Sequence, residues 1–369
     1  MKVLIAMDKY KGSLTAVQAG EAVAAALHRA WPEAECTLCP IADGGEGTTD
    51  TLIAVLHGER VAVLVHDAQG RLVDANYGMT GDGTAIMEMS VASGLAMVSD
   101  LPLDPRTAST AGTGEMMLDA IRRGATRIII GIGGSATNEA GVGMAQVLGF
   151  RFLDDGGMAV DHLPAELERV VAIDPSALRM PEVLVACDVD NPLLGPRGAS
   201  HVYGPQKGVK DVNEFDERLR RVADLVARDL DCDHRDEPGA GAAGGLGFGL
   251  MSFCKAKLVS GFDLVADVTK LEQQIAACDL VITGEGKVDS QTLHGKGPVG
   301  VAEMARRHGK PVVAIAGAVE DSPAVRAKFD EAYAVKPTEM PLAEAMRRGA
   351  ELIQETVVRH AARLRELVL

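Results

Sequence analysis

The sequence predicts an α/β protein built from two α/β domains. Three observations support this: β-branched runs alternate with amphipathic helical stretches at both ends of the chain, the middle holds short strands joined by glycine turns, and 369 residues exceed a typical single core. We expect one parallel sheet made from both chain ends (1–60 plus 266–369) and a mixed-sheet α/β domain inserted at 61–265. A cleft between such domains is a common place for a small-molecule site.

The first part of the chain predicts strand, helix, strand and helix in turn. The apolar run KVLIAM is typical of a buried parallel strand, and the helical spacing after it can be capped by Ser13 or Thr15. ECTLCPIA predicts the second strand, and a glycine loop then enters a helix. Residues 60–90 predict three short strands linked by DAQG and TGDG turns, hence an antiparallel or mixed patch.

The rest of the chain continues the alternation, with one interruption. Residues 236–251, DEPGAGAAGGLGFGLM, resemble a glycine-rich linker without regular structure, unless their backbone is pressed against another element. The other expected elements are helix then strand over 113–134, strand and loop over 181–193, helix over 213–230, strand and loop over 278–289, helix over 298–309, strands over 310–319 and 331–337, and a long helix from 341 to the end.

Bulk composition excludes several classes of function. A formal charge of −15 leaves no basic stripe for nucleic acid. The six cysteines are scattered, with one lone C-x-x-C, which favours buried thiols in a reducing compartment. No secretory signal is recognisable, and no apolar run approaches the roughly 20 residues that span a bilayer. We therefore expect a cytoplasmic protein with neither nucleic acid nor a membrane as partner.

Six loops that follow predicted strands combine glycine with charged or amide residues. The loops after parallel strands converge on one edge of a sheet, where ligands bind. Six such loops suggest a polyanion site with a metal. They are DKYKGS (8–13), ADGGEGT (42–48), GGSATNEAG (133–141), CDVDNP (187–192), YGPQKG (203–208) and TGEGKVDSQT (283–292).

The loop DKYKGS predicts a cradle for phosphate or carboxylate. Lys11 brings an ammonium group, and Ser13 stands where a helix offers free N–H groups. Asp8 adds a carboxylate at the strand end that a merely solvated loop does not require.

The loop TGEGKVDSQT is the most suggestive of catalysis. Its two glycines let the backbone approach a ligand, its lysine attracts phosphate, and its acids are candidates for metal ligand or general base. These residues are Gly284, Glu285, Gly286, Lys287 and Asp289.

Two acidic loops are further candidates for a metal. Asp43 could bind Mg²⁺ or a hydroxyl group, although acids there also suit a helix N-terminus. Asp188 and Asn191 follow a strand, and such oxygen ligands can turn toward one hard cation; a plain turn at Asn191-Pro192 is the alternative.

The stretch GIGGSATNEAGVG at 131–143 leaves three interpretations open. Gly131, Gly133 and Ala136 fit G-x-G-x-x-A, and acids follow about 20 residues later, as in dinucleotide-binding proteins. The other interpretations are an anion-binding turn and a purely structural turn. The anion-binding turn would use Gly133, Gly134, Ser135 and Asn138.

Taken together, the loops resemble one known family. DKYKGSL, ADGGEGT, GTGE, GIGGSATNEAG, ACDVDNPL, YGPQKG, GAGAAGGLG and TGEGKVDSQT…GKGPVGVA occur in the order seen in type 1 bacterial glycerate kinases, and the resemblance covers essentially the whole chain. It implies an ATP- and Mg²⁺-dependent kinase that converts D-glycerate to 2-phosphoglycerate, with 3-phosphoglycerate less expected. It also implies that one domain is a flavodoxin-like or Rossmann-like parallel sheet.

The resulting hypothesis is in-line phosphoryl transfer from ATP to the C2 hydroxyl of D-glycerate. Asp289 or Asp43 would act as base, with Lys11 and Lys287 at the phosphates. The alternatives are an NAD(P)-dependent oxidoreductase and a non-enzymatic anion-binding protein, and a homodimer is left open. The residues expected to bind substrate or phosphate are Asp8, Ser13, Gly133, Gly134, Ser135, Asn138, Lys207, Gly284 and Gly286, and those expected at the metal are Asp188, Asn191 and Glu285.

Overall fold

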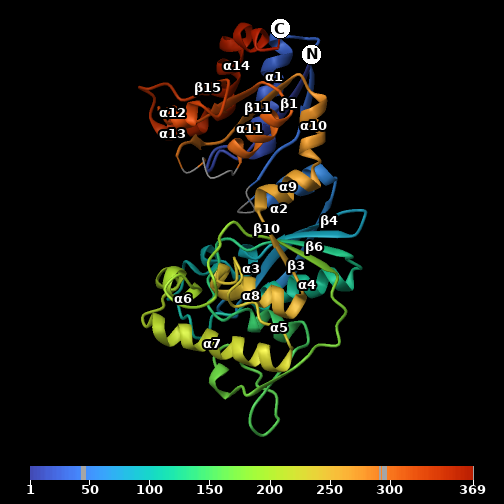
Figure 1. Cartoon of the computed structure of the whole chain (residues 1–369), viewed down its shortest axis with the longest axis vertical. Helices are drawn as coiled ribbons and strands as arrows, with labels where there is room; N and C mark the ends of the chain where they lie inside the picture. Colours follow the sequence, from blue (N-terminus) through green and yellow to red (C-terminus); the bar gives the residue numbers. More distant parts are fainter. Residues whose placement is uncertain (43–46, 291, 293–296, 369) are drawn as a thin grey trace. The chain divides into compact units, whose positions relative to one another are not determined.

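The computed structural model describes residues 1–42, 47–290, 292 and 297–368, and the chain divides into two compact units (Figure 1). Asp43, one of the residues predicted at the site, lies outside the described residues. Unit 1 comprises Met1–Asp43, Asp50–Leu56 and Phe262–Leu369, and unit 2 comprises Gly44–Thr49 and His57–Gly261.

Unit 1 holds a five-stranded parallel sheet in the order β15-β13-β11-β1-β2. The central pair joins distant parts of the chain, because Val3 of β1 lies opposite Leu280 of β11. The elements of unit 1 are β1 (Lys2–Met7), α1 (Ala16–Ala30), β2 (Glu35–Leu38), most of α2 (Thr48–Leu56), most of α9 (Gly261–Val268), α10 (Leu271–Ala277), β11 (Leu280–Gly284), β12 (Lys287–Val288), α11 (Pro298–Arg307), β13 (Val312–Ala316), β14 (Ala318–Val319), α12 (Pro323–Arg326), β15 (Glu331–Ala334), α13 (Leu342–Arg347) and α14 (Gly349–Glu366).

Helices cover both faces of this sheet, as its apolar strands require. Successive side chains of a strand point to opposite faces, so Val3 and Ile5 of β1 pack with α1 and α14, whereas Leu4 packs with α10 and α11 (Figure 1). Thr15 caps α1 through its hydroxyl, and Gln18 completes the capping box. The two layers leave the ends of the strands as the accessible part of the sheet.

Unit 2 holds a six-stranded mixed sheet in the order β10-β9-β6-β5-β4-β3, where β3 and β4 are antiparallel and the other neighbours from β5 to β10 are parallel. Its elements are β3 (Glu59–His66), β4 (Leu72–Met79), β5 (Thr84–Glu88), α3 (Ser90–Ser93), η1 (Leu95–Val98), α4 (Ala111–Arg122), β6 (Arg127–Gly131), α5 (Val142–Val147), β7 (Arg151–Leu153), η2 (Leu167–Arg169), β8 (Ala172–Asp174), β9 (Glu182–Ala186), α6 (Ala199–Tyr203), η3 (Pro205–Lys207), α7 (Val212–Asp229), α8 (Ala242–Cys254) and β10 (Lys257–Val259). The α/β fold class predicted from the sequence is confirmed.

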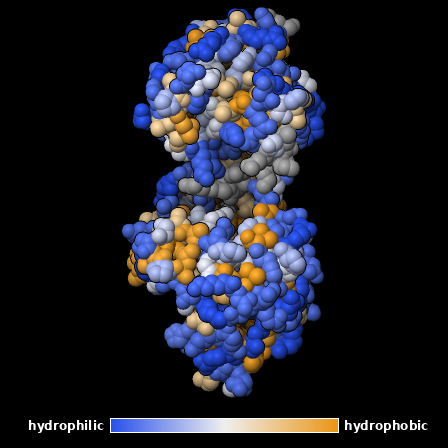
Figure 2. Space-filling view, turned by 90° about the vertical axis from the view of Figure 1, so that its left-hand side faces the viewer, coloured by the Kyte–Doolittle hydropathy of each residue, from blue (hydrophilic) through white to orange (hydrophobic). Residues whose placement is uncertain are grey.

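One large core holds unit 2 together. Side chains of β5, β6 and β9 pack there with those of α4, α5, α7 and α8. Asp211 caps α7 by accepting from the N–H groups of Asn213 and Glu214. The face shown in Figure 2 is mostly hydrophilic, and apolar side chains gather there in a patch on unit 2. Among the described residues, no helix has the length and apolar content to cross a membrane.

The interpretation of residues 236–251 as a linker is wrong. They lead into α8, most of whose residues are buried in the core of unit 2. The glycines serve close backbone packing: a Cβ on Gly244 would lie 1.9 Å from the carbonyl oxygen of Thr137, and one on Gly249 would lie 2.5 Å from that of Ala140. The glycine run is therefore a packed segment, with a left-handed kink at Ala243, Gly244 and Gly245 before the rest of α8, that lies against the loop 132–141 and is not a flexible connector.

Candidate active site

In unit 1, two predicted loops meet at the centre of the parallel sheet. The chain leaves β1 toward β2 on one side and leaves β11 toward β13 on the other, so the order of strands reverses between β1 and β11. The loops that follow these strands touch directly, because the N–H of Asp8 donates to the carbonyl oxygen of Gly284 over 2.8 Å. Open α/β sheets bind their ligands at such a switch point.

The glycines of the β11 loop allow its close packing. A Cβ on Gly284 would lie 1.6 Å from the carbonyl oxygen of Ile315, so a side chain there has no room. Gly286 lies against the β1 loop, since its Cβ would be 3.5 Å from the backbone nitrogen of Lys11. These two glycines thus bring the backbone of both predicted anion loops together.

The charged side chains at this edge form a connected group. The Nζ of Lys287 lies 2.8 Å from Oδ2 of Asp289, and this carboxylate raises the pKa of the lysine. The hydroxyl of Thr292 donates to Glu285 over 2.9 Å and accepts from the N–H of Asp289 over 3.1 Å. The side chain of Lys11 is exposed. Three of the predicted charged residues therefore share one loop, with their positions linked through Thr292.

Two other predicted residues of unit 1 have structural partners. Asp8 is 6% exposed and accepts from the N–H of Lys9 over 2.6 Å. The hydroxyl of Ser13 donates to the carbonyl oxygen of Met346 over 2.5 Å, which ties the β1 loop to α13.

In unit 2, the loop after β6 presents a glycine pair at its surface and a polar cluster beneath. Gly133 and Gly134 are exposed, whereas Ser135 is only 6% exposed. Lys207 reaches this serine from η3: its Nζ donates to Ser135 Oγ over 2.6 Å and to the carbonyl oxygen of Thr137 over 2.7 Å. The structure thus brings together two predicted residues, Ser135 and Lys207, that are distant in sequence.

A buried carboxylate lies on the far side of the same loop. Glu139 is 2% exposed and accepts from Thr110 Oγ1 over 2.7 Å and from the N–H of Gly143 over 2.7 Å. Burial raises the pKa of Glu139 and lowers that of Lys207, and the negative charge of Glu139 opposes the shift of the lysine. Because Glu139 already binds the N-terminal N–H groups of α5, that helix end is not a site for an added anion.

The loop after β9 is held by its own side chains. The amide of Asn191 accepts from Tyr203 Oη over 2.6 Å and donates to the carbonyl oxygen of Arg197 over 2.7 Å. Oδ1 of Asp188 accepts from the N–H of Gly261 over 3.0 Å. No group of three or more His, Cys, Asp or Glu side chains with metal-binding geometry occurs within the part of the chain that is described. Asp188 and Asn191 belong to unit 2 and Glu285 to unit 1.

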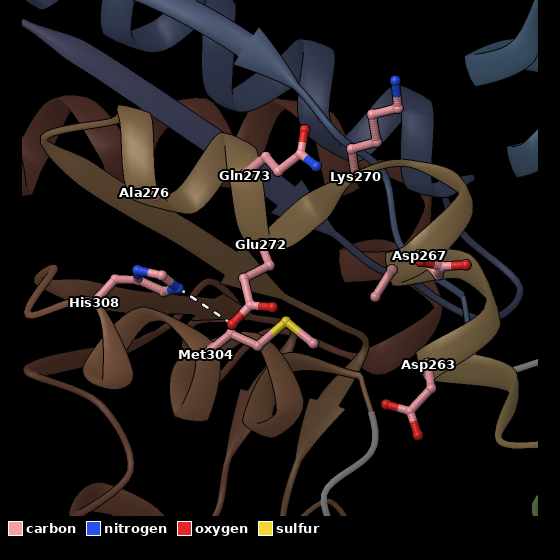
Figure 3. A pocket seen from close by; sticks show the side chains of 9 residues that line it. Asp263, Asp267, Lys270, Glu272, Gln273, Ala276, Met304 and His308 are labelled. Carbon is pink, nitrogen blue, oxygen red and sulfur yellow. Dashed lines mark hydrogen bonds and ion pairs between the residues drawn. The ribbon is translucent and has the colours of Figure 1, made fainter.

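A pocket of about 490 Å³ opens between α9, α10 and α11 of unit 1 (Figure 3). Acids from two helices face it, and Nε2 of His308 lies 3.2 Å from Oε1 of Glu272. None of the residues predicted at the site lines it. The lining residues are Asp263, Ala266, Asp267, Lys270, Glu272, Gln273, Ala276, Met304 and His308.

Comparison with known proteins identifies the family. The profile described as "Glycerate kinase family" matches residues 3–365, nearly the full chain. The chain belongs to the glycerate kinase family. It is 45% identical over 328 residues to a glycerate 2-kinase from Escherichia coli, covering 87% of this chain and 86% of that one. It is 43% identical over 365 residues to a glycerate kinase from Bacillus subtilis, covering 96% of each chain.

A solved structure agrees with this glycerate kinase fold. The crystal structure assigned to glycerate kinase 2 from Salmonella typhimurium LT2 superposes with a TM-score of 0.91 at 43% identity, covering 99% of this chain and 98% of that one. The resemblance seen in the ordered loops is therefore confirmed.

In this glycerate kinase the loop 131–143 does not have the structure of a dinucleotide-binding turn. In that fingerprint the glycine turn opens directly onto a helix, whose N-terminus binds the pyrophosphate. Here α5 begins only at Val142, well after Ala136, and Glu139 occupies its N-terminus. The family and this geometry set aside the NAD(P)-dependent alternative.

Two acids of this glycerate kinase, Glu139 and Glu88, were not among the residues predicted at the site. Glu139 holds the loop from below, and an acid just before a helix that starts with Gly141-Val142 was the signal available for it. Glu88 ends β5, is 9% exposed and accepts from the N–H of Thr49 over 3.0 Å. Its signal was its place at the carboxyl end of a buried strand.

Proposed function

We propose that this chain catalyses the transfer of the γ-phosphoryl group of ATP to the C2 hydroxyl of D-glycerate, giving ADP and 2-phosphoglycerate. The observation that carries the proposal is the 45% identity to a glycerate 2-kinase over 87% of the chain. The switch point of unit 1 carries charged groups that suit a triphosphate, and the loop 133–138 of unit 2 carries donors that suit a small carboxylate.

The triphosphate is assigned to the switch point of unit 1. Exposed Lys11 and Lys287 offer two positive charges, and the backbone of Gly286 lies beside Lys11. Asp8 and Ser13 hold the β1 loop through the hydrogen bonds described above, so we give them a supporting role in phosphate binding.

Asp289 is proposed as the base. In the transfer, the oxygen of the C2 hydroxyl forms a bond to the γ-phosphorus, the bond from that phosphorus to the β,γ-bridging oxygen breaks, and the hydroxyl proton passes to a carboxylate. The carboxylate of Asp289 lies 2.8 Å from Nζ of Lys287, which places the proposed base beside one of the cations assigned to the phosphates. Asp43 remains the second candidate.

Glu285 of the β11 loop also fits Mg²⁺. Mg²⁺ in kinases takes one or two carboxylates and completes its shell with phosphate oxygens and water. Glu285 provides one such carboxylate, which accepts from the hydroxyl of Thr292 over 2.9 Å. When bound, the ion would neutralise phosphate charge. Asp188 and Asn191 remain further candidates for the metal.

A kinase assay tests the proposal. ADP release would be followed with ATP, Mg²⁺ and D-glycerate, and phosphorus NMR would identify the product. We expect ADP release that requires D-glycerate and a phosphate signal at C2. Turnover with a signal at C3 would exclude the 2-kinase assignment, and D-glycerate binding without ADP release would favour an anion-binding protein.

A further inference from the structure

The cluster beneath Gly133 and Gly134 contains a lysine that cannot touch a ligand directly. Lys207 is 2% exposed, and its ammonium group donates to Ser135 Oγ and to the carbonyl oxygen of Thr137. Both donor–acceptor distances, 2.6 and 2.7 Å, are in the range of charge-assisted hydrogen bonds. Lys207 can therefore be linked to a bound substrate by hydrogen bonds only through Ser135.

The direction of the Lys207–Ser135 hydrogen bond fixes the direction of the serine proton. A charged lysine has three donors and no acceptor, so Ser135 Oγ is the acceptor of this bond. The hydroxyl proton of Ser135 must then point to another group. Within the described part of the chain, no acceptor for this proton is found, and the serine adjoins the exposed pair Gly133-Gly134. The serine is thus poised to donate outward.

The surrounding groups also favour a small anion with more than one oxygen. The backbone N–H groups of Gly133 and Gly134 find no acceptor among the described residues. Asn138 is 1% exposed, its amide nitrogen donates to Ser200 Oγ over 2.9 Å, and its Oδ1 has no partner. A buried amide oxygen without a partner costs free energy unless a donor reaches it. The carboxylate of a hydroxy acid offers two acceptor oxygens for the exposed donors, whereas Asn138, which is as buried as Lys207, lies behind them.

We propose that Ser135 binds the carboxylate of D-glycerate and that Lys207 is the positioning residue that orients and polarises the serine hydroxyl. This inference rests on the proposed function and deepens it, because it assigns the carboxylate, not the triphosphate, to unit 2. It also makes Ser135 a determinant of specificity for small 2-hydroxy carboxylates over their neutral amides.

Direct binding of D-glycerate without ATP separates this inference from the kinase assignment. Calorimetry would give the Kd of D-glycerate and of neutral D-glyceramide for the wild type, Ser135→Ala, Lys207→Met and the double variant. We expect Ser135→Ala and Lys207→Met each to raise the Kd of D-glycerate about 10- to 100-fold, as expected for a lost hydrogen bond to a charged group. The Kd of D-glyceramide should change much less.

The double variant tests whether the two residues act as a unit. If Lys207 acts only through Ser135, the double variant binds D-glycerate about as weakly as Ser135→Ala alone, and the effects are not additive. Additive losses would overturn the positioning role of Lys207. Lys210→Met is the matched control, because Lys210 is an exposed lysine in the same unit, and it should bind D-glycerate as the wild type does.

Further readouts keep the outcomes distinct. The KM for ATP should stay unchanged in Ser135→Ala while the KM for D-glycerate rises; a rise only in the KM for ATP would place the triphosphate at this loop and overturn the inference. If Lys207→Met does not fold by circular dichroism, Ser135→Ala alone still decides, and an unchanged Kd refutes the proposal. A wild-type protein that binds D-glycerate without turning it over would contradict the kinase assignment alone.

Discussion

Replacement of Gly244 by alanine tests whether the close packing of α8 holds the loop 132–141 in place. Gly244 has φ +69°, in the left-handed region, and a Cβ there would lie 1.9 Å from the carbonyl oxygen of Thr137 and 2.7 Å from Cα of Asn138. The left-handed conformation costs an alanine about 1–2 kcal/mol. Forcing an extra carbon against fixed backbone costs about 1–3 kcal/mol more. We therefore expect Gly244→Ala to lower the free energy of unfolding by about 2–5 kcal/mol.

Gly70→Ala in the same unit is the matched control. Gly70 has φ +85°, and a Cβ there meets no atom within 4 Å, so only the conformational cost of about 1–2 kcal/mol applies. Urea unfolding of both variants, followed by circular dichroism, gives the comparison. Because the displaced backbone belongs to Thr137 and Asn138, Gly244→Ala should also raise the KM for D-glycerate. Equal losses of stability in the two variants would refute the argument from close packing.

Three other predictions follow from the structure. Asp289→Asn should lower kcat by about 10²- to 10⁴-fold with little change in the KM for D-glycerate, as steady-state kinetics would show, and an unchanged kcat would remove Asp289 as base. Burial lowers the pKa of Lys207 to about 7, although the negative charge of Glu139 opposes this shift. As the pH rises through that value, the lysine loses its proton and Ser135 donates its hydroxyl proton to the lysine instead of to the substrate. The KM for D-glycerate should therefore rise between about pH 6 and pH 9, whereas the KM of Lys207→Met should not change with pH. Tyr10→Phe removes the hydrogen bond of 2.6 Å from a buried hydroxyl to the carbonyl oxygen of Ile315 and should lower the free energy of unfolding by about 1–3 kcal/mol in urea, an effect that would be absent if water replaced the hydroxyl.

The fold was largely predictable because its signals are local. Apolar runs such as KVLIAM at β1 and RIIIG at β6 bound the strands, and the rule that loops after parallel strands share an edge predicted the meeting of the β1 and β11 loops. The glycine run before and within α8 was misjudged because composition describes the backbone's freedom, not what lies against it. Only the contact of Gly244 with Thr137 shows that the glycines serve packing.

The residue types of the candidate site were predictable from the sequence, but the burial and the hydrogen-bond partners of these residues were not. Lys207 of YGPQKG was expected to bind substrate or phosphate, whereas the structure shows it buried and donating to two protein oxygens from η3. The burial of Glu139 depends on the packing of α5 and α4, which no short stretch of sequence encodes. The roles assigned to Lys11, Lys287, Asp289 and the metal-binding candidates stay predictions for the assays above.

The pairing of β1 with β11 also constrains the order in which the chain folds during synthesis. Val3 finds its partner Leu280 only after more than three quarters of the chain has been made, whereas residues 57–261 of unit 2 are continuous and can collapse as they emerge. Until β11 has been made, the apolar side chains of β1 and α1 lack the strand that completes their sheet. Chaperone dependence and aggregation during expression should therefore originate in the N-terminal segment of unit 1, and variants that weaken the β1–β11 pair should lower soluble yield more than equally destabilising variants in unit 2.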